Sequence, residues 1–356
     1  MDLPVFDYAE PGNLSGLGWP CNSSDCISVD TLSCPAPAPR AALLYGLALL
    51  YVFIFLAGAL ANAAVLWAGL RAPGPGADAR CYVLNLAVAD LCVVVTVPLW
   101  TASLLRRDQW PLGRLSCQLA HLLFSVNLFC SIFLLAAMSL DRYLAVARPP
   151  RRPPARRLAC GLAWLLAVAV SLPDTVFLQT VTSASGNETF CRPLYPEQSA
   201  REWLLAVELL SLLLGFAGPF CVIAASYCLL ARALAASPDA ERRGRRLPLA
   251  YVLVFALCWL PYRAAALLDV ALALHLVPFS CRLEEALLAA LHVTQCLSLL
   301  HCCVNPLLYG LAHRAYRYEL MKAFIFKYSA KTGLARLMDA SRGSDAESSV
   351  LEPPAK

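Results

Sequence analysis

An acid, a base and a phenol stand in a row at Asp141, Arg142 and Tyr143, directly after an apolar segment that runs from Leu115 to Leu140. Side chains at such a boundary can be buried against neighbouring helices or released to water. A carboxylate and a guanidinium placed there can therefore exchange ion-pair partners. The chemistry that these residues offer is a charge switch rather than the making or breaking of covalent bonds.

Asp90 lies deep inside another apolar segment, and Asn127 and Asn305 lie in two further segments where they could join it. A charge within an apolar span is costly and usually faces a cavity or a partner. Two interpretations stay open for this polar core. It is either a site for a small cation or a proton, or a hydrated network that holds helices together.

A second group of polar residues falls at one level of the apolar segments, under the orientation argued below. It combines three acids and one base with aromatic and amide side chains: Asp174, Glu208, Asp269, Arg263, Trp100, Tyr262 and Gln295. Three acids at one level predict an outward-facing pocket for a cationic ligand. The alternative is a set of helix-end residues whose polar tips reach the membrane surface.

Motifs for catalysis are absent from the sequence, which has no His-Glu-x-x-His, phosphate loop or nucleophile elbow. His121, His275, His292 and His301 are scattered, which favours packed or solvated histidines over metal ligands. A retinal pump would need a lysine within a span, and the seventh apolar segment has none. We expect no enzyme activity, no cofactor, no transporter repeat and no nucleic-acid partner.

The elements that must position these residues are membrane-spanning helices. The 356-residue chain is 59% hydrophobic and only 15% charged, whereas soluble domains carry about a quarter charged residues. Segments long enough to cross a hydrocarbon core of about 30 Å are Ala41–Leu70, Cys81–Leu105, Leu115–Leu140, Leu158–Leu178, Trp203–Leu230, Leu247–Leu274 and Ala286–Ala312. We predict an all-α membrane protein, a seven-transmembrane-helix bundle. Prolines should kink five of the spans, at Pro98, Pro173, Pro219, Pro261 and Pro306.

Basic residues in the short loops orient this bundle. The connections after the first, third and fifth segments are rich in arginine, and the stretch after the seventh is rich in basic residues. The connections after the second, fourth and sixth segments carry fewer basic residues. Because basic loops stay in the cytoplasm, the N-terminus should lie outside. Sequons at Asn13, Asn22 and Asn187 fall on the predicted outer side and are candidate glycosylation sites. The first forty residues resemble no signal peptide, so the first span should act as an uncleaved insertion signal.

Four regions follow from this pattern: an extracellular arm over 1–40, the transmembrane domain over 41–312, an amphipathic juxtamembrane helix over 313–328 and a cytoplasmic tail over 329–356. The arm carries acids and, up to Pro39, no lysine or arginine: Asp2, Asp7, Glu10, Asp25 and Asp30. An acidic arm over an acidic pocket predicts a basic partner that is recruited by long-range attraction. Tyr8, between Asp7 and Glu10, is a candidate for sulfation.

Six of the sixteen cysteines lie in or beside the predicted outer segments: Cys21, Cys26, Cys34, Cys117, Cys191 and Cys281. An even number in an oxidising compartment indicates disulfides. Six cysteines allow fifteen pairings, and their spacing does not choose among these. The remaining cysteines should be packed thiols.

Three motifs, taken together and in order, resemble the rhodopsin class of G-protein-coupled receptors. They are Asp141-Arg142-Tyr143, Cys258-Trp259-Leu260-Pro261-Tyr262 and Asn305-Pro306-Leu307-Leu308-Tyr309. The resemblance implies that the switch comprises Asp141, Arg142, Tyr143, Trp259, Pro261, Asn305, Pro306 and Tyr309. Four further stretches are similar to the atypical members of the chemokine receptor family: Phe6–Tyr8, Cys21–Cys26, His292–Cys296 and Tyr318–Lys327.

That family resemblance implies a multi-pass plasma-membrane receptor that binds, internalises and scavenges basic CXC chemokines. Such a receptor cycles through endosomes and recruits arrestin without productive G-protein activation. The resemblance implies disulfides Cys117–Cys191, Cys34–Cys281 and Cys21–Cys26, and chemokine contacts at Trp100, Asp174, Glu208, Asp269 and Gln295. Receptor kinases would act on tail serines, for which the candidates are Ser341, Ser344, Ser348 and Ser349. Membrane lipid is a further expected partner. Formation of a homodimer, or of a heterodimer with another chemokine receptor, stays an open alternative.

Two features depart from the atypical pattern. The stretch Leu144-Ala145-Val146-Ala147-Arg148 is close to the Leu-Ala-Ile-Val continuation of signalling chemokine receptors. It keeps open the alternative of a conventional chemokine receptor that couples to inhibitory G proteins. Arg263 adds a cation to the pocket, where it could neutralise Asp269 or Glu208 and alter ligand preference.

Overall fold

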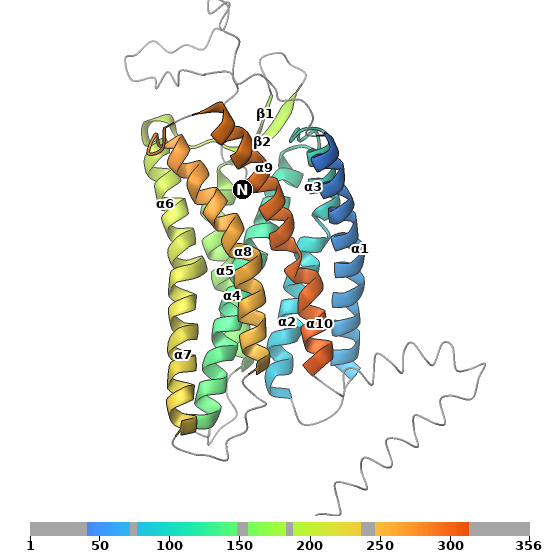
Figure 1. Cartoon of the computed structure of the whole chain (residues 1–356), viewed down its shortest axis with the longest axis vertical. Coiled ribbons are helices and arrows are strands. Elements are labelled where there is room, and N and C mark those ends of the chain that lie inside the picture. Colours follow the sequence, from blue (N-terminus) through green and yellow to red (C-terminus); the bar gives the residue numbers. More distant parts are fainter. Residues whose placement is uncertain are drawn as a thin grey trace, which may run out of the picture.

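The computed structural model describes residues 41–71, 77–147, 156–182, 188–235, 246–278 and 280–312. Over these residues the chain forms a bundle of helices along one long axis (Figure 1). The elements are α1 (Ala41–Arg71), α2 (Ala77–Val94), α3 (Val97–Leu105), α4 (Arg114–Ala147), α5 (Arg156–Val176), β1 (Leu178–Thr182), β2 (Thr189–Pro193), a 3-10 turn (Glu197–Ser199), α6 (Ala200–Leu212), a π-helical turn (Leu213–Ala217), α7 (Gly218–Ala235), α8 (Arg246–Ala273), α9 (Cys281–Leu299) and α10 (His301–Ala312). We call the end with β1 and β2 the hairpin end, and the end with Asp141 the triplet end.

Seven helical spans in the described residues are long and apolar enough to cross a membrane, which confirms the predicted seven-transmembrane-helix bundle. Boundaries differ from the prediction in several spans, including the third and the seventh. The third span continues to Ala147, so the triplet lies inside α4 rather than at its end. The seventh span begins at Cys281 rather than Ala286, because the Ser280 side chain caps α9 by accepting a hydrogen bond from the Leu283 N–H.

Some prolines coincide with a break or an irregular turn in a span, whereas others lie within a continuous helix. The second span breaks into α2 and α3 just before Pro98, which sits at the start of α3, where a missing N–H costs little. The fifth span contains the π-helical turn just before Pro219. Pro173 and Pro261 lie inside the uninterrupted helices α5 and α8.

Pro306 lies inside α10 and leaves the Cys302 carbonyl without its usual helical donor, because proline has no N–H. Asn62 of α1 supplies the missing donor. Its buried side-chain Nδ2 donates to the Cys302 carbonyl at 2.7 Å and to the Gly58 carbonyl at 2.9 Å. The proline therefore creates a polar contact that ties the first span to the seventh.

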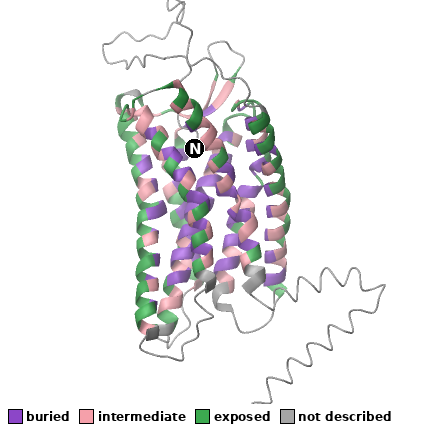
Figure 2. Ribbon diagram, viewed as in Figure 1, coloured by how far each residue is buried: buried purple, intermediate pink, exposed green. Residues whose placement is uncertain are grey.

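Helix α4 forms the centre of the bundle and packs against α2, α5, α7 and α8. In its most apolar stretch 78% of the residues are buried, against 28% in the corresponding stretch of α1. Figure 2 shows buried residues towards the interior and exposed ones along the outer faces. On α1 the exposed side chains include Leu49, Phe53, Leu56 and Leu60. Such a continuous apolar surface suits contact with lipid rather than water.

The two strands were not foreseen, because the fourth segment was predicted to run to Leu178 as helix. Instead β1 and β2 pair antiparallel, with Thr180 opposite Cys191. A disulfide joins Cys191 to Cys117 at the start of α4, which is the pairing that the family resemblance implied. The Gln118 side chain also donates to the Leu178 carbonyl at 3.1 Å. The hairpin is thus fastened to the central helix.

Several predictions concern residues outside the described ones. Cys281 is disulfide-bonded, but its expected partner Cys34 lies outside the described residues, as do Cys21 and Cys26. The same holds for the sequons, the candidate sulfotyrosine, the tail serines and the juxtamembrane helix: Asn13, Asn22, Asn187, Tyr8, Ser341, Ser344, Ser348, Ser349 and residues 313–328. These features stay predictions.

Candidate functional site

A buried ion pair lies in the hairpin-end half of the bundle, between two neighbouring spans. Arg263 of α8 donates through Nη2 to Oε1 of Glu208 on α6 at 2.6 Å, and the exposed fractions of the two side chains are only 2% and 9%. The guanidinium carbon of Arg263 also lies 5.9 Å from the centre of the Phe216 ring. Of the two acids that Arg263 could neutralise, the structure selects Glu208.

Two further acids of the predicted group lie in the same region. Asp174 is buried near the end of α5, within electrostatic reach of both Glu208 and Arg263. Asp269 is half-buried on α8 and lies about 9 Å along the helix from Arg263 towards the hairpin end. Together with the Glu208–Arg263 pair, the region brings three acids and one base close to the hairpin end.

Tyr195, in the loop between β2 and α6, was missed by the sequence analysis. Its ring lies 5.0 Å from Phe177, which in turn lies 4.9 Å from Trp203. Burial raises the pKa of Tyr195 well above its ordinary value, and the carboxylates of Asp174 and Glu208 add to the effect. The phenol therefore stays neutral and can donate a hydrogen bond at the mouth of the acidic region.

Buried donors without a hydrogen-bond partner in the described part of the chain include Nε2 of Gln295 and Nε1 of Trp259, both among the predicted residues. Buried polar atoms are usually satisfied, so these are available to water or a ligand. Trp100 differs, because its Nε1 donates to Thr96 Oγ1 at 3.1 Å. Trp100 can therefore offer a ligand only its ring.

An unbroken series of aromatic contacts leads from this region into the bundle. The Tyr262 ring lies 5.6 Å from Phe124, Phe124 lies 5.2 Å from Trp259, and Trp259 lies 5.6 Å from His301. All of these side chains except Phe124 belong to α8 or α10. The packing gives a physical connection between the acidic region and the polar core around Asp90.

The polar core joins the residues that the sequence analysis grouped, and adds a histidine. Asp90 is fully buried and accepts hydrogen bonds from Asn127 Nδ2 at 3.1 Å and from Asn305 Nδ2 at 3.0 Å. His301 Nε2 lies 3.3 Å from Asp90 Oδ1. Its position four residues before Asn305, on the same helix face, was the signal that could have identified it.

The two ring nitrogens of His301 face different neighbours. Nδ1 lies against the Ser298 carbonyl, and Nε2 lies against the Asp90 carboxyl group. Asp90, His301 and Cys302 place three potential metal-ligand atoms within 4.8 Å of one another. A cation would have to displace the protein donors that already surround Asp90.

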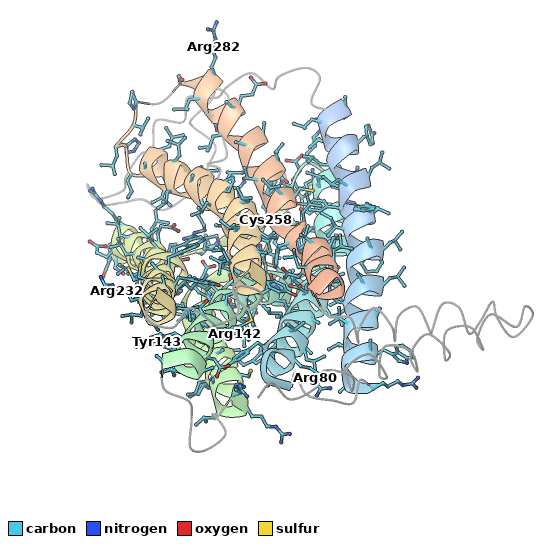
Figure 3. All side chains as sticks on the ribbon, turned by 60° about the horizontal axis from the view of Figure 1, so that its bottom comes forward. Arg80, Arg142, Tyr143, Arg232, Cys258 and Arg282 are labelled. Atoms are coloured by element: carbon cyan, nitrogen blue, oxygen red, sulfur yellow. A yellow bond between two sulfur atoms is a disulfide. The ribbon has the colours of Figure 1, made fainter. Side chains whose placement is uncertain are left out.

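At the triplet end, Asp141 pairs with Arg156 of α5 rather than with its neighbour Arg142. The distance from Arg156 Nε to Asp141 Oδ2 is 3.0 Å. Adjacent residues on a helix point in different directions, so Asp141 and Arg142 face different neighbours. Arg142 and Tyr143 are half-buried, and Figure 3 shows them at this end, with Arg282 at the far end. Arg142 lies within electrostatic reach of Tyr227 on α7.

Comparison with known families gives a match to the 7 transmembrane receptor (rhodopsin family) over residues 61–309. The chain belongs to this family. It is therefore a multi-pass membrane protein of a receptor family, as the motifs predicted.

Individual relatives narrow the placement. The chain is 58% identical to atypical chemokine receptor 3 of Canis lupus familiaris and 58% identical to that of Homo sapiens, over the full length of both proteins in each case. It is 32% identical to G-protein coupled receptor 182 of Mus musculus, over 85% of this chain and 77% of that receptor. The predicted resemblance to the atypical chemokine receptors is confirmed.

Proposed function

We propose that this chain is an atypical CXC chemokine receptor that binds, internalises and scavenges chemokine. In this proposal it recruits arrestin without productive G-protein activation. The observation that carries the proposal is the full-length identity of 58% with human atypical chemokine receptor 3. The acidic region around Asp174, Glu208 and Asp269 supports it, because three acids beside one base suit a cationic ligand.

The proposal places the hairpin end outside the cell and the triplet end in the cytoplasm. The arginine-rich loops support this orientation. So does the disulfide Cys117–Cys191, because disulfides persist in oxidising compartments. The sequon at Asn187, between β1 and β2 in the sequence, supports the same choice.

In the proposed binding step, the acidic N-terminal arm gathers a basic chemokine by long-range attraction. The N-terminus of the chemokine then enters the bundle. Its ammonium group is attracted to the acids of this region, Asp174 and Asp269, while Glu208 holds its ion pair with Arg263. Gln295 donates its free amide hydrogen to a ligand carbonyl, and Trp100 and Tyr262 supply aromatic walls.

Ligand contacts then favour one arrangement of the sixth and seventh spans, which pivot near Pro261 and Pro306. A ligand shifts such an equilibrium only through its differential affinity for the two states. The packed series Tyr262, Phe124, Trp259 and His301 links the ligand to Asp90. At the triplet end Arg142 changes partners, and receptor kinases and arrestin engage the serine-bearing tail. Internalisation into endosomes removes the chemokine.

The binding step is tested by changing Asp174→Asn and Asp269→Asn together and measuring uptake of a fluorescent basic chemokine at equal surface expression. Each charge-assisted contact contributes about 1.5–3 kcal/mol, so uptake at low chemokine concentration should fall at least about tenfold. Glu202→Gln is the matched control, because Glu202 is an exposed acid in the first turn of α6. Undiminished uptake by the double variant would overturn the pocket assignment.

The second candidate is a conventional chemokine receptor that activates inhibitory G proteins. The observation that favours it is the Leu144-Ala145-Val146-Ala147 continuation after the triplet. Both candidates share the pocket and the ligand class, so they differ only in what binds at the triplet end. Nucleotide exchange measured beside arrestin recruitment separates them.

A further inference from the structure

Two free thiols from different spans touch near the triplet end. The sulfur of Cys81, in the second turn of α2, lies 3.5 Å from the sulfur of Cys160, in the second turn of α5. Cys160 is buried, whereas Cys81 is only half-buried. The pair takes no part in the proposed ligand pocket or in the polar core.

Polar contacts on either side of the sulfurs hold α2, α4 and α5 in register. One turn further along α5, Trp164 Nε1 donates to Asn85 Oδ1 at 3.0 Å, and Asn85 Nδ2 donates to the Cys81 carbonyl at 2.8 Å. One turn back along α5, Arg156 forms its ion pair with Asp141 of α4. The three α5 residues are spaced four apart, so they form one stripe on the helix. The two thiols therefore face each other because neighbouring contacts fix the helices, and not through a chance side-chain orientation.

We propose that Cys81 and Cys160 form a dithiol site that a peroxide converts into a disulfide between α2 and α5. The sulfurs would close from 3.5 Å to the bond length of about 2.05 Å. Closure would therefore bring the two sulfur atoms about 1.5 Å nearer to each other.

The reaction balances with hydrogen peroxide as the oxidant. The half-exposed Cys81 sulfur, as thiolate, attacks one peroxide oxygen and breaks the O–O bond, which gives a sulfenic acid and, after proton transfer, one water. The Cys160 sulfur then attacks the Cys81 sulfur and expels the sulfenic oxygen as a second water. Two thiols lose two electrons to the peroxide, and a dithiol reductant reverses the change.

The disulfide would add a covalent tie one helical turn from the ion pair between Asp141 and Arg156. It would restrain α5 against α2 in the part of the bundle where the triplet lies. This inference is independent of the proposed function, because it concerns the chemistry of two thiols and not the ligand.

The test exposes the full-length receptor in membranes to hydrogen peroxide, alkylates the remaining thiols and maps the digest by mass spectrometry without reduction. We expect a Cys81–Cys160 cross-linked peptide that disappears with dithiothreitol, and a fall of about fivefold in alkylation of both cysteines. Retention of both thiols, or a cross-link from Cys81 to a different cysteine, would overturn the proposal.

Two variants keep the result interpretable. Cys160→Ala should abolish the cross-link and leave Cys81 open to alkylation or to a sulfenic-acid probe. Cys92→Ala removes another free, half-buried thiol of α2 and should leave the cross-link unchanged. Formation of the same disulfide-linked mass in the Cys160→Ala variant would show that the peptide was wrongly assigned, and so would count against the site.

Discussion

At the scale of single residues, the charge of the proposed pocket depends on Arg263. The sequence did not decide which acid pairs with this side chain. Arg263 could have faced Glu208 or Asp269, because all three belong to the same half of the bundle. The choice depends on how α6 and α8 are rotated about their axes, which hydropathy does not encode. The structure pairs Arg263 with Glu208 at 2.6 Å. Glu208 therefore already has a cationic partner before any ligand binds.

The buried pair gives a prediction about stability. Glu208→Ala should lower the free energy of unfolding by about 3–5 kcal/mol, because it leaves the Arg263 charge buried without its carboxylate. Thermal unfolding of the purified receptor measures this effect. The double variant Glu208→Leu with Arg263→Met replaces both charges by apolar groups and should recover most of the loss. A double variant as unstable as Glu208→Ala would contradict this account.

His301 and Tyr195 show why other site residues escaped the sequence analysis. His301 was grouped with scattered histidines, although its spacing of four from Asn305 places both on one helix face. Tyr195 lies in a loop, where no periodicity indicates the direction of a side chain. By contrast the grouping of Asp90, Asn127 and Asn305 agrees with their hydrogen bonds. Polar residues inside apolar spans usually face the bundle interior and pair with one another.

At the scale of elements, Asn62 and Pro306 depend on each other. The proline removes the donor for the Cys302 carbonyl, and Asn62 replaces that donor from another span.

The seven spans themselves could be predicted, because long apolar segments are a strong signal. The hairpin could not, because its strands are short and flank a loop. The helical end of the third span was also missed, since the helix outlasts its apolar stretch.

The Asn62 contact predicts a coupled effect of two substitutions. Asn62→Leu should cost about 1–3 kcal/mol of stability, because it leaves a buried carbonyl unsatisfied. In a Pro306→Ala background the new backbone N–H can satisfy that carbonyl, so the same change should cost markedly less. A double-mutant cycle of thermal unfolding measures this coupling. Equal costs in the two backgrounds would show that Asn62 stabilises the receptor in another way.

At the scale of the whole molecule, the bundle has two chemically different ends. The hairpin end holds the disulfide, Tyr195 and the acidic region, and the triplet end holds Arg142, the Asp141–Arg156 pair and the two facing thiols. The aromatic series and the polar core connect them. In the proposed function the hairpin end binds the chemokine, and the triplet end changes conformation and is engaged by receptor kinases and arrestin.

The proposed orientation predicts which terminus an antibody can reach. A peptide tag at the N-terminus should be stained on intact cells, and a tag at the C-terminus only after the membrane is made permeable, because the arginine-rich loops should stay in the cytoplasm. Immunofluorescence with and without detergent measures this. Staining of the C-terminal tag on intact cells would reverse the assignment of both ends.

The central claim is that chemokine binding leads to arrestin recruitment without activating a G protein. The most direct measurement adds a basic CXC chemokine to cells and follows arrestin recruitment and nucleotide exchange on inhibitory G proteins side by side, with a conventional chemokine receptor as the positive control. The account predicts arrestin recruitment, lost in the variant with Asp174→Asn and Asp269→Asn, and nucleotide exchange no higher than in cells without the receptor. Chemokine-driven exchange comparable to that of the conventional receptor would contradict it.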